Sequence, residues 1–515
     1  MKKDNLIVLI TCLLLTQFFS YSQEIPFVEY INFSSVKPTG ITLEYCWNAL
    51  GVDSSNNIYV VFGGPYNKVE SGYMFKYNAD TKNKEYLGSF IDILKANDNY
   101  EDNESVPKGH TELPFYKGIV YFGTQPFHDL WGGTVYDLEN YRGSHLIAYD
   151  TLSQEVKDLS KNKAGGVFQD YQGIMGLQAM PDSDYIVCFS HPRGDLLLYN
   201  PGPDSVVRIV PGPVQNFGLH VPRCIVVYKT KVFYAMGWMD SDLYVYDLSD
   251  NTLIKTNQKT TGGFWNGKAQ TSDGRHVYLM TALGNLYHLD AETNHVEFLS
   301  NVFVGDEFED AGAPYNQYCL SMSVDQSCLY FIPTRTQPGS MASAGYLYKY
   351  DLTTNIQKMV GWVGNGTYTG NNIHDREGNL YFAWHNNSID GKLIRINRRA
   401  LEDISTSTAG SFRFDSEVTQ PFSLEQNRPN PFSEATSVIL KLEVEAHVTV
   451  DIFDYSGKNV SFPVKDYYTS GQHQLMWNGN DYYGKPCKPG LYILRVQIRT
   501  ADQVYVLNQK LTKID

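Results

Sequence analysis

The sequence predicts an all-β protein in which a seven-bladed β-propeller is followed by a small C-terminal β-sandwich. Two observations predict the propeller: one strand-and-turn motif occurs seven times, and a second strand pattern precedes each copy. Four short strands repeated about every 45–50 residues are typical of propeller blades. A third observation, the change in sequence after residue 402, separates the predicted propeller (25–402) from the sandwich. The seven copies begin at Ser71, Ser144, Gly194, Ser241, Gly284, Gly345 and Gly391.

The motif has a physical reason in each blade. In the copy SDLYVYDLSD, we expect Leu243, Val245 and Tyr246 to fill the layers between neighbouring blades. An aspartate follows the strand, where its carboxylate can accept hydrogen bonds from the turn backbone. A structural role is therefore predicted for Asp150, Asp247, Asp290 and Asp351. A first, inner strand is expected before each pair, for example TELPFY at 111–116.

The seventh blade shows only three strands before its pattern ends near Arg398. The N-terminal segment FVEYINFSS, which begins at Phe27, is the predicted fourth strand. The alternative donor is SFRFDSEV from Ser411. Either segment would close the ring and remove exposed sheet edges.

The N-terminus, MKKDNLIVLITCLLLTQFFSYSQ, has a basic start, an apolar run and small or polar residues at its end. These features predict a secretory signal peptide over residues 1–22. Lipidation of Cys12 is the alternative that the same run leaves open. No later segment has the ~20 uncharged apolar residues of a transmembrane helix.

The composition of the chain limits the kinds of molecule that we expect it to bind. The formal net charge of −14 argues against nucleic acid, because phosphate binding depends on basic surface. The cysteines outside the signal peptide form no CxxC pair, so we predict buried free thiols. No metal site is predicted, and the motifs do not identify a cofactor.

A polar stretch, predicted to be a linker over residues 403–420, precedes a region with its own motifs. Residues 421–515 contain LEQNRPNPF, DYSGKNV, Trp477–Gly479 and Gly490–Tyr492. This region resembles the type A sorting domain of the type IX secretion system of Bacteroidota. The resemblance implies an Ig-like β-sandwich that the export machinery reads, in a protein that is secreted or anchored on the outer cell surface. A carbohydrate-binding sandwich is the alternative.

Basic and aromatic residues gather in the loops expected to open on one face of the propeller, around its channel. Arginine can pair with a carboxylate, and aromatic rings can stack on a sugar. We therefore predict that an anionic polysaccharide binds at this mouth; the alternative is that these side chains only fill the channel. The predicted binding residues are Trp47, Trp131, His191, Arg223, Trp238, Lys268, Tyr318 and Asn371.

Four residues from the second and third blades form the densest group at the mouth: His110, His128, Tyr171 and Arg193. A polysaccharide lyase needs a base, an acid and a group that neutralises the uronate carboxylate. Histidine and tyrosine can transfer both protons, while arginine and a second histidine hold the carboxylate. The motifs GHTELPF, QPFHD, QDYQG and SHPRGD are similar to the site of the seven-bladed propeller ulvan lyases. The resemblance implies β-elimination of a uronate-containing, ulvan-like polysaccharide.

Other functions stay open. A non-catalytic surface propeller could bind glycans or proteins at the same mouth, without needing His110 and Tyr171 together. A glycosidase needs a pair of carboxylates, for which Asp129 and Asp240 are candidates. A metal-dependent lyase is matched less well, because the sequence contains no HxH motif.

Overall fold

The computed structural model describes most of the chain between Phe27 and Asp515. The predicted signal peptide (1–22) and linker (403–420) lie outside the described residues. Within the described residues, no helix has the length and apolar character needed to cross a membrane. The described residues are 27–64, 71–125, 141–213, 223–237, 240–302, 315–316, 318–335, 345–364, 366–385, 391–399, 401, 422–454, 459–461, 464–499 and 504–515.

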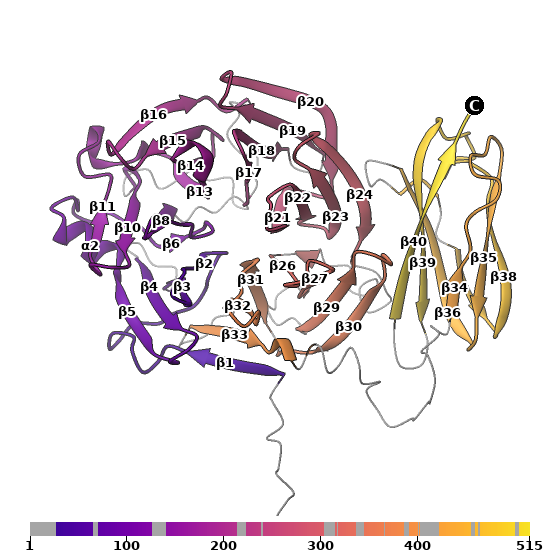
Figure 1. Ribbon diagram of the computed structural model, residues 1–515, viewed down its shortest axis with the longest axis horizontal. Helices are drawn as coiled ribbons and strands as arrows, with labels where there is room; N and C mark the ends of the chain where they lie inside the picture. The colour runs from indigo at the N-terminus through magenta and orange to yellow at the C-terminus, as the bar shows by residue number, and fades with distance from the viewer. Residues whose placement is uncertain are drawn as a thin grey trace, which may run out of the picture.

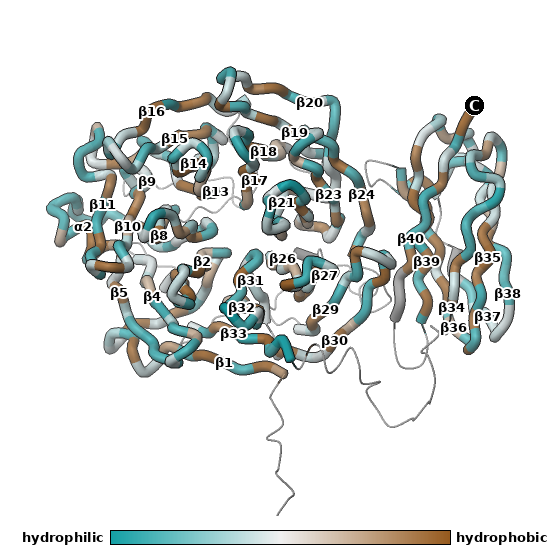
Figure 2. Tube along the Cα trace, in the orientation of Figure 1, coloured by the Kyte–Doolittle hydropathy of each residue, from teal (hydrophilic) through white to brown (hydrophobic). Residues whose placement is uncertain are grey.

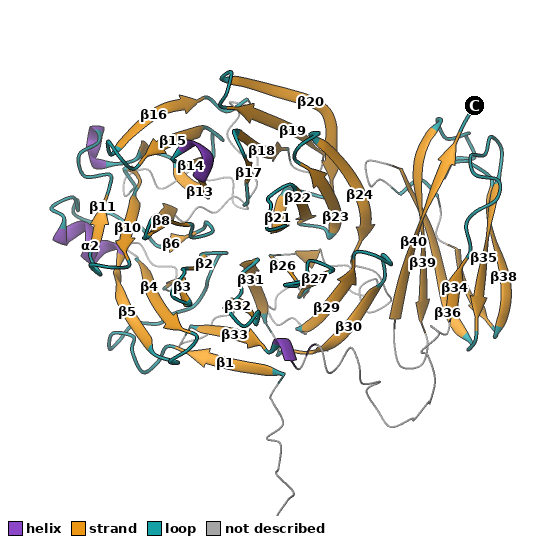
Figure 3. Cartoon of the chain, in the orientation of Figure 1, coloured by secondary structure: helices purple, strands orange, loops and turns teal. Residues whose placement is uncertain are grey.

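The described part of the chain forms seven antiparallel blades around one axis (Figures 1 and 3). The first strand of each blade lies nearest the axis and the fourth lies at the rim (Figure 1). The β-propeller predicted from the repeated motif is therefore confirmed.

The strands of blades 1 to 3 follow the chain in order. Blade 1 contains β2 (Leu50–Val52), β3 (Asn57–Gly63), β4 (Gly72–Asn78) and β5 (Lys84–Ser89). Blade 2 contains β6 (Lys108–Gly109), β7 (Phe115–Tyr116), β8 (Ile119–Gln125), β10 (Leu146–Asp150) and β11 (Val156–Asp158). Blade 3 contains β13 (Gly173–Met180), β14 (Tyr185–His191), β15 (Leu196–Asn200) and β16 (Ser205–Val210).

Blades 4 to 7 repeat the pattern. Blade 4 contains β17 (Val226–Tyr228), β18 (Lys231–Met236), β19 (Asp240–Asp247) and β20 (Thr252–Thr261). Blade 5 contains β21 (Trp265–Gln270), β22 (His276–Thr281), β23 (Asn285–Asp290) and β24 (His295–Asn301). Blade 6 contains β26 (Cys319–Met322), β27 (Cys328–Phe331), β29 (Tyr346–Asp351) and β30 (Gln357–Trp362). Blade 7 contains β31 (Thr367–Asn371), β32 (Leu380–His385), β33 (Lys392–Ile396) and β1 (Val28–Asn32).

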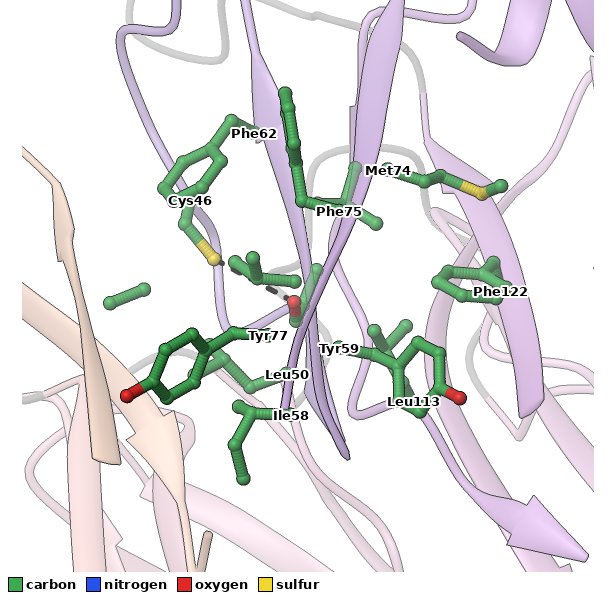
Figure 4. Packing of buried hydrophobic residues seen from close by; sticks show 14 of the residues in the cluster. Cys46, Leu50, Ile58, Tyr59, Phe62, Met74, Phe75, Tyr77, Leu113 and Phe122 are labelled. Atoms are coloured by element: carbon green, nitrogen blue, oxygen red, sulfur yellow. Dashed lines mark hydrogen bonds between the residues drawn. The ribbon is translucent and has the colours of Figure 1, made fainter. Parts of the chain in front are cut away.

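The hydrophobic core lies between neighbouring blades, because each twisted sheet has two faces to bury. Leu243 and Val245 belong to the cluster that joins blades 4 and 5, whereas Tyr246 belongs to the cluster that joins blades 3 and 4. The prediction that these residues fill the layers between blades is confirmed, and side chains of one strand enter both layers. Figure 2 shows the hydropathy of each residue along the strands, and Figure 4 shows the aromatic and aliphatic packing around blade 1.

The aspartates of the motif hold turns. Asp247 accepts hydrogen bonds from the backbone N–H and the hydroxyl of Ser249, at 2.9 and 2.7 Å. Asp150, Asp290 and Asp351 accept the same backbone bond from the residue two positions further on. Their predicted structural role is confirmed.

The predicted free thiols are also confirmed. The cysteines of the described residues form no disulfide, and all except the half-buried Cys487 are buried. Burial raises the pKa of the Cys46 thiol to about 12, so this group stays protonated and unreactive.

The N-terminal strand β1 closes the ring as predicted. It pairs with β33 in antiparallel register, from Val28 opposite Ile396 to Asn32 opposite Lys392. An ion pair of 3.0 Å between Glu29 and Arg395 reinforces this pairing. The alternative donor from Ser411 lies outside the described residues.

The described residues from Phe422 onward form a C-terminal unit of two sheets around one hydrophobic cluster. The first sheet contains β34 (Phe422–Leu424), β35 (Thr436–Leu442) and β38 (Gly471–Trp477). The second contains β36 (Ala446–Asp454), β37 (Val464–Tyr468), β39 (Gly490–Arg499) and β40 (Val504–Lys513).

The C-terminal unit lies beside the rims of blades 5 and 6 (Figure 1). The rings of Phe453 and Phe298 have their centroids 5.5 Å apart, and Arg495 donates a hydrogen bond of 3.3 Å to the carbonyl of Asn301. A backbone pairing also joins β40 to β30. The propeller and the C-terminal unit therefore share apolar, polar and backbone contacts.

A buried histidine clamps the segment between blades 1 and 2. Nε2 of His145 lies 3.0 Å from Glu104 and its Nδ1 lies 3.5 Å from Asp158, with both carboxylates fully covered. Arg142 also pairs with Glu104 at 2.8 Å. Burial alone would lower the pKa of His145, but the two carboxylates raise it above its ordinary value. Burial raises the pKa of Glu104, but His145 and Arg142 lower it by more. The pKa of Glu104 therefore lies below its ordinary value.

This clamp predicts a pH-dependent contribution to stability. A histidine with a raised folded pKa contributes stability below its unfolded pKa, near pH 6.5, and loses it as the pH rises through the folded pKa. His145→Gln keeps hydrogen-bonding capacity without the charge. The difference in melting temperature between parent and variant should therefore be largest between about pH 5 and 6.5 and should shrink at higher pH. A difference that is the same at every pH from 5 to 9 would contradict the charged clamp.

Candidate functional site

The first strands of blades 2, 3 and 5 are irregular. In blade 3 the register of β13 shifts at Met175, and in blade 5 the register of β21 shifts at Asn266. Such bulges redirect side chains, and they are common beside functional sites. In blade 2 the predicted strand TELPFY at 111–116 is wrong, because β6 and β7 leave residues 110–114 between them. This break frees His110 and Glu112 from the ladder.

Residues that precede the first strands of four blades meet at the mouth. The guanidinium carbon of Arg223 lies 5.1, 5.3 and 4.8 Å from the ring centroids of Trp47, Phe264 and Tyr318. The rings of Trp47 and Tyr318 are also in edge contact, 5.9 Å apart. Cation–π attraction of this kind fixes the guanidinium among the rings. The structure thus brings together three predicted binding residues, Trp47, Arg223 and Tyr318.

His110 lies against this group. Its ring stacks on Trp47 with centroids 5.6 Å apart, and Nζ of Lys108 lies 5.3 Å from the centroid of the same indole. Burial, with the nearby charges of Arg223 and Lys108, holds the pKa of His110 well below its ordinary value. The imidazole is therefore neutral at pH 7.

Glu112 forms a polar bridge across the axis. Its carboxylate accepts hydrogen bonds from Lys268 at 2.6 Å, from Asn371 at 3.2 Å and from the amide of Gln178. The Lys268 ammonium also donates to the carbonyl of Ile225 at 3.1 Å. These residues belong to blades 2, 5, 7, 3 and 4 respectively. Lys268 and Asn371, which we predicted to bind substrate, are thus both bonded to Glu112.

Tyr171 precedes the first strand of blade 3, and Arg193 follows the second strand of the same blade. Tyr171 has a φ of 54°, which is uncommon for tyrosine, and 54% of its surface is exposed. The Arg193 backbone donates to Oε1 of Gln172 at 3.0 Å, and its Nε lies 3.3 Å from Asp195. Arg193 and Asp195 line a cavity of about 790 Å³ between residues 162–170 and β16. Both predicted catalytic side chains are therefore open to solvent.

The predicted catalytic set is not gathered in one contact group. His110 is 2% exposed, and no hydrogen bond or ring contact among the described residues joins it to Tyr171 or Arg193. Burial, Arg223 and Lys108 lower the pKa of His110 most, and His191 adds a smaller effect in the same direction. The predictions that lie outside the described residues are those for His128, Trp131, Trp238 and Asp129.

Sequence reasoning missed three residues of this region: Glu112, Lys108 and Phe264. Glu112 follows His110 by two positions in GHTELPF, so a carboxylate next to a candidate base was a visible signal. Lys108 and Phe264 carried no such signal, because they join the mouth only through the placement of their blades.

Comparisons with known proteins add the following. No family model matches the chain, and no curated protein matches it. Among solved structures, the chain is similar to the WD40 repeats of RRP9 (TM-score 0.47, 9% identity, 72% of this chain and 97% of that one). It is also similar to U3-55K (TM-score 0.47, 9% identity, 72% and 98%) and to a chain of the mitotic checkpoint complex (TM-score 0.45, 11% identity, 72% and 95%). The propeller assignment rests on the strand pairing described above.

Proposed function

We propose that this protein is a secreted polysaccharide lyase that binds a uronate-containing polymer at the propeller mouth and cleaves it by β-elimination. One observation carries the proposal: the neutral imidazole of His110 lies among Trp47, Lys108 and Arg223. Aromatic faces suit a pyranose ring, and cations suit its carboxylate. This combination supports recognition of an acidic sugar, with His110 as the candidate base.

The reaction assigns a task to each residue. The proton next to the uronate carboxylate is transferred to a base, a carbon–carbon double bond forms, and the bond to the 4-linked oxygen breaks. That oxygen leaves with a proton from an acid. In our proposal His110 and Tyr171 transfer the protons, and Arg193 with His128 neutralises the carboxylate. Tyr171 and Arg193 are exposed to solvent and could therefore be reached by a polymer bound at the mouth.

A second candidate is a non-catalytic surface propeller that binds glycans or proteins. His110 is almost completely buried, whereas about half of the surface of Tyr171 is exposed. This difference in exposure favours the second candidate. Binding needs the Trp47, Arg223 and Tyr318 group but no proton transfer.

A panel of uronate polysaccharides separates the two candidates. The lyase should generate unsaturated ends, detected as ultraviolet absorbance, from at least one polymer. Binding measured on the same panel without any absorbance would replace the lyase with the binding propeller. If no uronate polymer is cleaved or bound, the lyase is rejected and uronate polymers are excluded as ligands of the binding propeller.

We further propose that the C-terminal unit is an Ig-like β-sandwich that directs the protein through the type IX secretion system. Its two sheets around one hydrophobic cluster and the motifs LEQNRPNPF and DYSGKNV support this. Deleting residues 422–515 should trap the propeller in the periplasm, as measured by cell fractionation. The matched control is Met476→Ala, an exposed position in the same unit, which should be exported normally. Unchanged export of the deletion would reject the sorting role.

A further inference from the structure

One face of blade 5 carries an unusual set of nitrogen and oxygen ligands. In the register of the sheet, His276 lies opposite Asp290, and His288 lies opposite Glu297. Directly paired residues of antiparallel strands project from the same side of a sheet. His276 and His288 are therefore diagonal neighbours on one face, with Glu297 beside His288.

The two imidazoles face each other closely. Nδ1 of His276 lies 3.0 Å from Nε2 of His288, and the ring centroids are 5.1 Å apart. Zinc–nitrogen bonds are about 2.0–2.1 Å long, so two ligands at 90–110° on one ion have nitrogens roughly 2.9–3.4 Å apart. The observed separation falls within this range. Binding an ion would require both rings to turn about χ2, which is a soft torsion, so that their lone pairs converge on it.

The surroundings keep these rings available as ligands. Both histidines are only partly buried, so an ion from solvent can reach them. The two carboxylates of the face are already engaged, since Asp290 pairs with Arg275 at 2.8 Å and Glu297 pairs with Lys510. The two imidazole nitrogens, rather than the carboxylates, are therefore the groups of this face that can bind a metal ion.

We infer that His276 and His288 form a chelating site for a divalent first-row transition ion such as Zn²⁺ or Cu²⁺, with the remaining positions open to water. Imidazole nitrogen selects such ions over Mg²⁺ and Ca²⁺, which prefer oxygen. Among the described residues no group of three or more potential ligands is gathered for a metal, so the site is a two-histidine chelate. The site lies on β22 and β23, the two middle strands of blade 5.

The test uses the full-length protein after chelator treatment. Calorimetric titration should show one Zn²⁺ per chain, and the melting temperature should rise with added Zn²⁺. His276→Ala and His288→Gln should each lose both effects, with circular dichroism confirming that they are folded. The electron paramagnetic resonance spectrum of bound Cu²⁺ should show coupling to two nitrogens.

The control is the double variant His447→Ala/His473→Ala, which removes two histidines of the C-terminal unit. It should bind Zn²⁺ as the parent does. Undiminished binding in both His276→Ala and His288→Gln would overturn the site and leave the pair as a hydrogen-bonded one. An equal loss in the control would also overturn it, by showing adventitious binding to surface histidines only.

Discussion

The Glu112→Ala variant is expected to lose about 3–5 kcal/mol of stability, because it leaves the ammonium of Lys268 buried without its carboxylate. The side chain of Lys268 is 5% exposed, and Glu112 accepts bonds from three other blades. Losing the bridge therefore weakens contacts across the whole ring. The measurement is the melting temperature of the propeller transition by calorimetry, which should fall well below that of the parent.

Two further variants make this prediction specific. Glu112→Leu/Lys268→Met removes both charges and should recover much of the loss, since no unpaired charge stays buried. Glu85→Ala breaks an ion pair of the same 2.6 Å length whose carboxylate is 48% exposed. It should cost at most about 1 kcal/mol. If Glu112→Ala melts like Glu85→Ala, the bridge is not a stabilising element.

The Tyr171→Phe variant is expected to cleave the polymer about 10²–10⁴-fold more slowly, if the phenol transfers a proton in the proposed reaction. The side chain is 54% exposed, so removing one hydroxyl should leave the fold intact. The initial rate of ultraviolet absorbance increase measures the effect. Substrate affinity should change little, because the ring that contacts the sugar is kept.

Arg193→Ala should also reduce cleavage, because the uronate carboxylate then lacks its neutralising cation while the proton leaves. The control Tyr483→Phe removes the hydroxyl of a more exposed tyrosine in the C-terminal unit and should cleave as the parent does. Parent-like cleavage by Tyr171→Phe would remove this tyrosine from the proposed site, even if the protein is a lyase.

The sequence was sufficient for the blade pattern because the pattern is local. Each motif copy contains its own alternation and its own turn aspartate, so Leu243, Tyr246 and Asp247 could be assigned without knowledge of the neighbouring blades. Ring closure by β1 could also be predicted, since one strand was missing at one end and one was spare at the other.

The candidate site could be predicted only in part. Trp47, Arg223 and Tyr318 meet as expected, because each precedes the first strand of its blade. The pairing of Lys268 with Glu112 could not be predicted, since it depends on how far a side chain reaches across the axis from a broken strand. The sequence pattern shows which residues precede the first strand of a blade. It does not show how far a side chain extends into the channel.

The closure of the ring by β1 has a consequence for the order of folding. Val28 pairs with Ile396, so the first propeller strand to be synthesised waits for the last. Pairings between distant segments form slowly, and an unpaired strand edge is open to aggregation and proteolysis until then. A chain that ends before residue 392 lacks β33, so β1 has no strand with which to pair. The pairing of β1 with β33 therefore depends on a complete propeller. We expect truncated chains, in which β1 has no partner strand, to be more sensitive to proteases.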